Sequence, residues 1–224
     1  MNVSEALESR FTCRAFLPDP VAPSTIAALL EAARRTPSGG DLQPWWVWAL
    51  TGEKLKALTS IATGEVAAGR LLADPVEYVI YPPEKEPYSG RRFRTGEAMY
   101  EAIGLARDDW QGRMQQTSRN FEFFGAPVGL FIAIDRTMLP PQWADLGMFL
   151  QSLMLLAREH GLHTAPIEAW SFQHRTVRDF LGMPEDLILW CGLAIGHADP
   201  ADPINAFRAE RASLSEFASL IGFE

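Results

Sequence analysis

Hydrophobic residues recur at helical spacing in four stretches of the chain, with polar residues between them. In residues 24–35 the apolar side chains share one face, which predicts an amphipathic helix that the turn beginning at Pro37 terminates. Residues 143–160 are apolar almost all round, so we expect a helix in the core or at an interface, with Gly161 as its C-terminal stop. Two further helices are predicted over residues 53–69 and 173–181.

Both ends of the chain carry residues that can form a capping box. Asn2 and Glu5 are spaced to cap a short helix that ends near Arg10. Ser213 and Glu216 have the same spacing, and they predict a last helix after a stretch rich in Pro and Asp.

Short apolar runs bounded by turn residues predict four strands, over residues 45–50, 78–81, 127–135 and 187–195. Strands and long helices follow one another in mixed order, without the regular alternation of a doubly wound fold. The pattern therefore predicts an α+β fold in which one sheet packs against helices.

Residues 84–120 are polar, basic and irregular, with helical pieces around 97–106 and 110–119. We interpret this segment as a lid or excursion from a single domain that covers residues 1–224, because no linker is long enough to divide the chain. A C-terminal extension over residues 198–224 completes the predicted organisation.

The composition indicates a folded domain and argues against some classes of partner. The 224 residues are 47% hydrophobic and 21% charged, which is typical of one folded domain. A net charge of −8 makes nucleic acid and anionic membranes poor partners. No apolar run approaches the ~20 residues of a membrane span, and residues 1–10 do not resemble a signal peptide. With only two cysteines, these features predict a cytoplasmic protein.

Several common site motifs are missing from the sequence. It contains no G-x-G-x-x-G after a strand, no P-loop and no G-x-S-x-G. The four histidines have no metal-ligand spacing with each other or with the cysteines. We therefore expect no metal site.

Basic residues near both ends of the chain are the first positive signal. In an extended segment, Arg10, Thr12 and Arg14 would fall on one side. Arg208 and Arg211 are three residues apart and could share one face of a helical turn. Guanidinium groups match phosphate oxygens in geometry and charge, so these residues could bind a phosphate. The alternative is that they are ordinary surface arginines.

Two loops give weaker signals. Small residues at positions 37–40 would let the backbone approach a ligand closely, and Asp41 and Gln43 bring polar groups that could bind the edge of a heterocycle. A plain turn between a helix and a strand explains them equally well. Residues 166–170, between an apolar helix and a polar turn, form a third candidate, or a simple loop.

Five motifs follow one another along residues 4–216. They are Ser9-Arg10-Phe11-Thr12-Cys13-Arg14-Ala15-Phe16, Pro37-Ser38 with Gln43-Pro44-Trp45, Gly125-Ala126-Pro127, Asp145-Leu146-Gly147 with Gln151 and Gly161-Leu162, and Asn205-Ala206-Phe207-Arg208-Ala209-Glu210-Arg211. In this order they resemble the nitroreductase family of FMN-dependent oxidoreductases. One position departs from the family, which usually has Asn where this chain has Asp41; a carboxylate there would accept from the flavin N3–H but could not donate.

The resemblance implies a central, mostly antiparallel sheet flanked by helices, in an intertwined homodimer whose C-terminal extension embraces the partner. Two FMN molecules would lie in clefts between the subunits. The arginines and Thr12 would hold the phosphate and the pyrimidine edge, and residues 37–39 would approach from the partner chain. The cofactor contacts that it implies are Arg10, Phe11, Thr12, Arg14, Pro37, Ser38, Gly39, Asp41, Gln43, Pro166, Ile167, Glu168, Ala169, Arg208 and Arg211.

The implied activity is reduction of nitroaromatic compounds to nitroso and hydroxylamine products. NADH or NADPH would pass a hydride to the flavin and leave before the acceptor binds, so no side chain would be essential for catalysis. The aromatic residues Tyr100, Trp110, Phe123 and Phe124 would line the slot for the acceptor. The alternatives are a flavin-dependent quinone, activated-alkene or dehalogenating reductase, or a flavin-binding module without turnover.

Overall fold

The centre of the protein is one four-stranded sheet, seen in a computed structural model that describes residues 1–71 and 75–223. The strands lie in the order β1 (Trp45–Thr51), β2 (Val128–Asp135), β4 (Leu187–Gly196) and β3 (His163–Ile167). All three pairings are antiparallel. The predicted α+β fold with an antiparallel sheet is therefore confirmed.

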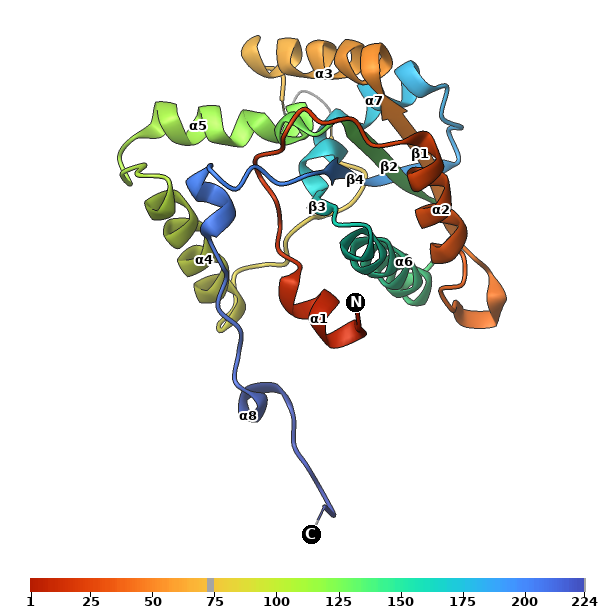
Figure 1. The fold of residues 1–224 in the computed structure, drawn as a ribbon, viewed down its shortest axis with the longest axis vertical. Coiled ribbons are helices and arrows are strands. Elements are labelled where there is room, and N and C mark those ends of the chain that lie inside the picture. The colour runs from red at the N-terminus through yellow and green to blue at the C-terminus, as the bar shows by residue number, and fades with distance from the viewer. Residues whose placement is uncertain (72–74, 224) are drawn as a thin grey trace.

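Helices cover both faces of this sheet (Figure 1). On one face lie α2 (Pro23–Ala33) and α6 (Pro140–Glu159); on the other lie α3 (Gly52–Ala67) and α7 (His174–Leu181). Alternate residues of β2 serve the two faces: Leu130 and Ile132 pack with α2 and α6, and Phe131 and Ala133 with α3 and α7. Because both faces are covered, the central strands are almost wholly buried and read as continuous apolar runs.

The two ends of the chain meet at the β3 edge of the sheet. The N-terminal helix α1 (Val3–Ser9) begins with the predicted capping box of Asn2 and Glu5. The chain then runs beside β3, where the Cys13 N–H donates to the Thr164 carbonyl at 3.0 Å. A bridge from Phe16 to Ala198 joins it to the segment after β4, which leads into the short helix η4 (Pro203–Ala206).

Two helices, α4 (Tyr88–Ala102) and α5 (Trp110–Ser118), lie to one side of the sheet (Figure 1). Neither helix contains a buried residue, which agrees with the polar character of this segment in the sequence. Beyond η4 the tail extends away from the body and carries α8 (Leu214–Phe217), with the predicted capping box of Ser213 and Glu216. No helix in the described ranges is long and apolar enough to cross a membrane.

Three details of the prediction are wrong. Residues 78–81 are not a strand, because Tyr78 is held through its side chain while Val79 is 79% exposed. The strand β3 was not predicted, since it contains Pro166; it is an edge strand, where proline is tolerated. Residues 207–213 are not helical, so Arg208 and Arg211 do not share a helical face.

Candidate functional site

Asn205 joins the N-terminal segment to the C-terminal tail. Its Oδ1 accepts from the Arg14 N–H at 2.9 Å, and its Nδ2 donates to the carbonyls of Ala15 and Asp199 at 2.7 and 2.9 Å. The residue is only 6% exposed, so water does not compete with these bonds. This amide fixes the position of Arg14 relative to the tail that carries Arg208.

Contacts among three side chains, Arg208, Phe11 and His163, extend the same junction. The Arg208 guanidinium lies 4.0 Å from the centroid of the Phe11 ring, and the Phe11 and His163 rings are 4.9 Å apart. Burial, together with the nearby charges of Arg158 and Arg208 and the neighbouring His197, lowers the pKa of His163 to about 4. The His163 ring is therefore neutral at physiological pH, and Arg208 is held against an uncharged surface.

Four arginines gather at this junction without acidic partners. In residues 1–71 and 75–223, no carboxylate oxygen lies within 4.0 Å of Arg10, Arg14, Arg208 or Arg211. Burial and the charge of Arg211 lower the pKa of Arg10, and burial lowers the pKa of Arg14. The buried Nε of Arg10 has no hydrogen-bond partner. Unpaired cations at one junction, two of them close enough to repel each other, can attract an anion in a protein of net charge −8.

A cavity of about 630 Å³ lies between the tail and α4. Arg208 and Arg211 line it from the tail, and Arg91 and Arg94 from α4. Arg91 pairs with Glu216 at 3.1 Å, which links α4 to the tail. The volume is in the range of small-molecule sites, although Arg10 and Arg14 of the N-terminal segment are not among its lining residues.

Hydrogen bonds within the chain hold the loop over residues 37–43. The Gly39 N–H donates to Asp145 Oδ2 on α6 at 3.1 Å, and the Gln43 N–H donates to Ser38 Oγ at 2.9 Å. Asp41 and Gln43 adopt left-handed backbone angles, with φ of 55° and 48°, and the Gln43 side-chain amide donates to Asp41 Oδ1 at 3.1 Å. Such strained conformations concentrate at ligand-binding sites.

This loop does not meet the arginines within one chain. No hydrogen bond or ion pair between the described residues joins Pro37, Ser38, Gly39, Asp41 or Gln43 to the four arginines. The structure thus brings together the first and last of the predicted motifs, and leaves this one apart.

The third candidate segment of the sequence, residues 166–170, adjoins the N-terminal segment that carries Arg10, Thr12 and Arg14. Pro166 and Ile167 end β3, and Glu168 and Ala169 begin the short helix η3 (Glu168–Gln173). Thr12 forms a parallel bridge with Thr164 of β3, so this junction adjoins the arginine-bearing segment. Among the described residues, the partly buried Glu168 carboxylate has no hydrogen bond or ion pair, and burial raises its pKa.

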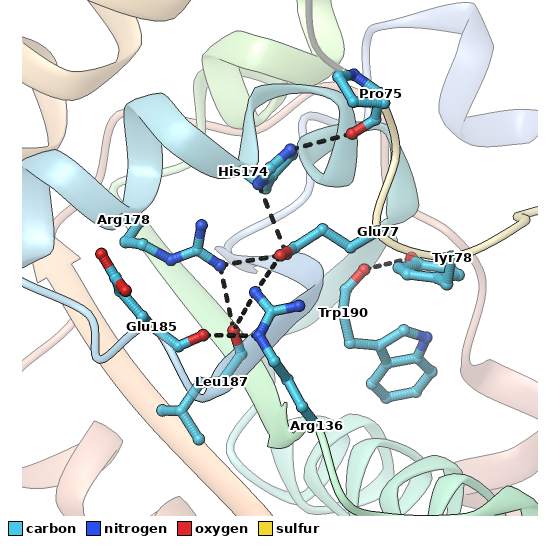
Figure 2. A network of polar contacts seen from close by, with 9 residues as sticks. All are labelled: Pro75, Glu77, Tyr78, Arg136, His174, Arg178, Glu185, Leu187 and Trp190. Atoms are coloured by element: carbon cyan, nitrogen blue, oxygen red, sulfur yellow. Dashed lines mark hydrogen bonds and ion pairs between the residues drawn. The ribbon is translucent and has the colours of Figure 1, made fainter.

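A polar network anchors the segment that leads to α4 (Figure 2). Glu77 Oε1 accepts from Arg136 and, at 3.0 Å, from Arg178 of α7. The His174 ring lies between two acceptors: Nδ1 is 3.5 Å from Glu77 Oε2, and Nε2 is 3.2 Å from the Pro75 carbonyl. Burial of Glu77 favours the neutral acid, but the arginines and His174 outweigh it and lower its pKa.

Tyr78, next to Glu77, lies over the middle of the sheet. Its hydroxyl donates to the Trp190 carbonyl of β4 at 2.5 Å (Figure 2). The Tyr78 ring centroid is 5.3 Å from that of Trp143 on α6. Burial raises the pKa of Tyr78. This phenol is therefore neutral, and its one hydrogen is committed to the backbone.

The four aromatic residues expected to line a substrate slot lie in two different environments. Trp110, at the start of α5, is 77% exposed, and the Arg113 guanidinium lies 4.3 Å from the Tyr100 ring centroid. Phe123 and Phe124 are 0% and 4% exposed and belong to the hydrophobic core, so their burial does not support a place in an open slot.

Glycines in the central strands explain the burial of Phe123. A Cβ on Gly129 would lie 2.8 Å from the Phe123 ring, and one on Gly192 would lie 2.9 Å from that ring and 2.5 Å from Trp170. Both glycines thus leave room for the two aromatic rings, which stack 4.9 Å apart beneath the sheet.

Four residues that shape these sites had no assigned role in the sequence. They are Asn205, His163, Tyr78 and Asp145. Asn205 and Asp145 belong to two of the five sequence motifs, and these motifs could have indicated their importance. His163 and Tyr78 act through contacts between distant segments and carry no local pattern.

Comparisons with known proteins agree on one family. The model of the nitroreductase family matches residues 7–197. The chain is 35% identical to a 4-nitrobenzoate reductase of Pseudomonas putida, over 96% of this chain and 94% of that protein. It is also 35% identical to a chloronitrobenzene nitroreductase of Comamonas testosteroni, over 98% and 96%. The crystal structure of the FMN and NADPH-dependent nitroreductase NfnB from Sphigopyxis sp. strain HMH superposes with a TM-score of 0.95, at 46% identity and full coverage of both chains.

Proposed function

Because this chain belongs to the nitroreductase family, we propose that it is an FMN-dependent oxidoreductase that reduces nitroaromatic compounds with electrons from NADH or NADPH. The relatives' names support the substrate class and the cofactors. The observation in this chain that carries the proposal is the group of four unpaired arginines from its two ends.

The arginine group fits the phosphate of FMN. Arg10 and Arg211 repel each other, and Arg10 Nε is buried without an acceptor. A phosphate monoester carries between one and two negative charges near neutral pH and three acceptor oxygens, so it would relieve the repulsion and satisfy the buried N–H. Arg14 and Arg208, held by Asn205 and Phe11, add two further cations.

When bound, FMN would supply the redox chemistry, taking a hydride from the nicotinamide and giving electrons to the nitro group. The chain would hold and orient it. The arginines would fix the phosphate, while the Asp41 carboxylate, which can only accept, would suit a ring N–H. The backbone at residues 166–169 would lie against the ring. Our assignment of Pro37, Ser38 and Gly39 to the same cofactor needs a second chain, since they lie apart from the arginines within one chain.

We also propose a homodimer. The tail beyond η4 extends from the body and exposes Phe217, Leu220, Ile221 and Phe223 by 68–85%. Exposed apolar side chains of this number are costly in water and are typical of a surface covered by a partner. On α6, Met148 is 43% exposed in the helix predicted to lie at an interface. Cys13 and Cys191 are both free and buried, which fits our proposal of a reducing cytoplasm.

An anaerobic spectral titration tests the function. We expect purified protein to bind FMN, to lose the oxidised-flavin absorbance when NADH or NADPH is added, and to regain it when a nitroarene follows. Protein that binds no FMN would contradict the whole proposal. Bound flavin that neither nicotinamide reduces would indicate a binding module, and reoxidation by quinones but not by nitroarenes would refute the substrate assignment.

A further inference from the structure

Reduction of a nitro group needs a proton as well as electrons. The balanced first step is ArNO₂ + NAD(P)H + H⁺ → ArNO + NAD(P)⁺ + H₂O. The nicotinamide is oxidised and gives two electrons and one hydrogen as hydride. One N–O bond breaks, and its oxygen leaves as water. One hydrogen of that water is therefore delivered as a proton, which the hydride does not supply.

Few groups near the β3–η3 junction can donate this proton. The Tyr78 hydroxyl donates its hydrogen bond to the Trp190 carbonyl, and burial raises its pKa. Burial also raises the pKa of the Cys191 thiol, which is 1% exposed. His163, with a pKa of about 4, carries no extra proton at neutral pH. Glu168 remains.

The surroundings of Glu168 favour its acid form. In the described part of the chain no cation pairs with its carboxylate and no donor binds it, in contrast to Glu77, which two arginines hold (Figure 2). The Tyr78 phenol and the Cys191 thiol lie within electrostatic range and are both neutral. Burial raises the pKa of Glu168 accordingly.

The position of Glu168 suits proton delivery. It is the first residue after β3, so the strand fixes its backbone beside the segment that carries Arg10, Thr12 and Arg14. Its side chain is partly exposed and therefore open to a ligand. Tyr78 lies within electrostatic range of Glu168, and its hydroxyl group is held by the Trp190 carbonyl.

We propose that the Glu168 carboxyl group donates the proton that converts a nitro oxygen into water, an inference that rests on the proposed function. The O–H bond of the acid breaks, a new O–H bond forms on the departing oxygen, and the carboxylate regains its proton from solvent. Glu168 would thus be a proton donor, although the sequence assigned no side chain a catalytic role.

Glu168→Gln tests this directly, since it keeps the size of the side chain but has no acidic proton. Glu185→Gln, in an exposed turn, is the matched control. Stopped-flow measurements separate reduction of the flavin-loaded enzyme by NAD(P)H from reoxidation of the reduced enzyme by nitrobenzene. We expect Glu168→Gln to slow only reoxidation, by about 100-fold, and to remove the decline of its rate as the pH is raised. Glu168→Asp should keep that pH dependence at a lower rate.

A readout without turnover accompanies the kinetics. Infrared difference spectra of the oxidised protein, recorded as the pH is raised, should show the loss of a carboxylic-acid band that is absent in Glu168→Gln and present in Glu185→Gln. Reoxidation of Glu168→Gln at the wild-type rate and pH dependence, equal slowing of both half-reactions, or a wild-type spectrum without this band would each overturn the proposal. Wild-type protein that NAD(P)H does not reduce would instead refute the proposed function.

Discussion

Replacement of Asn205 by alanine should separate the two ends of the chain that form the candidate site. The amide makes three hydrogen bonds, two of which link the N-terminal segment to the C-terminal tail across about 190 positions of sequence. The alanine methyl group can make none of them. The Ala15 carbonyl would keep its bond from the Asp199 N–H at 3.0 Å, whereas the Arg14 N–H and the Asp199 carbonyl would lose their Asn205 partner.

The size of the effect follows from those two unsatisfied groups. A buried polar group left without a partner costs about 1–3 kcal/mol, so we expect Asn205→Ala to lower the free energy of unfolding by about 3 kcal/mol. For a chain of this length that corresponds to a Tm lower by about 6–12 °C. Asn205→Asp should be similarly costly, because it keeps the acceptor for Arg14 but turns a second acceptor toward the two carbonyls.

Urea denaturation of the flavin-free protein, at one fixed protomer concentration, measures this loss. Asn120→Ala is the control: it removes one hydrogen bond, to Thr117 on the surface, and should cost less than about 1 kcal/mol. An Asn205→Ala protein as stable as this control would refute the view that the amide joins the two ends. FMN affinity should fall with stability, because Arg14 and Arg208 would no longer be held together.

Three further changes probe other parts of the structure. Leu153→Asp places an unpaired charge at a side chain that is 1% exposed, so we expect no folded protein by size-exclusion chromatography; a soluble, active variant would contradict this assignment. Glu77→Gln removes the only ion-pair partner of Arg178 among the described residues and should lower the free energy of unfolding by about 2–4 kcal/mol in urea. A loss below about 0.5 kcal/mol would exclude a stabilising network. Because the pKa of His163 falls from 6.5 to about 4 on folding, the unfolded chain binds the extra proton, and the stability that this ring contributes should be lost as the pH falls from about 6.5 to about 4. His163→Gln should flatten that part of the pH profile, and an unchanged slope would count against it.

The regular spacing of apolar residues explains why most of the fold could be predicted from the sequence. The four main helices and the three long strands were all expected, because each carries many apolar residues at a regular spacing. The strand β3 has only five residues and a proline, so its pairing with β4 leaves little local trace. Residues 78–81 look like a strand because their apolar side chains are close together, yet Tyr78 is held by its hydroxyl group.

The charged residues of the candidate site were predictable from the sequence, but the residues that hold them in position were not. Two arginines near each end of the chain suggested that the ends meet, and Arg208 does lie over Phe11. The contacts of Asn205 and His163 depend on segments far apart in sequence, which no local pattern records. The helical spacing of Arg208 and Arg211 was misleading, because the tail there is extended and the arginines are brought close to the N-terminal segment by packing.

The central claim is that arginines from both ends of the chain hold a phosphate. It is tested most directly by titrating flavin-free protein with FMN and with riboflavin, which differ only in that group. We expect FMN to bind at least about 100-fold more tightly, since two charge-assisted contacts contribute about 1.5–3 kcal/mol each, and Arg10→Ala and Arg211→Ala to reduce this preference strongly. Equal affinity for the two flavins, or a preference that both variants retain, would contradict the claim.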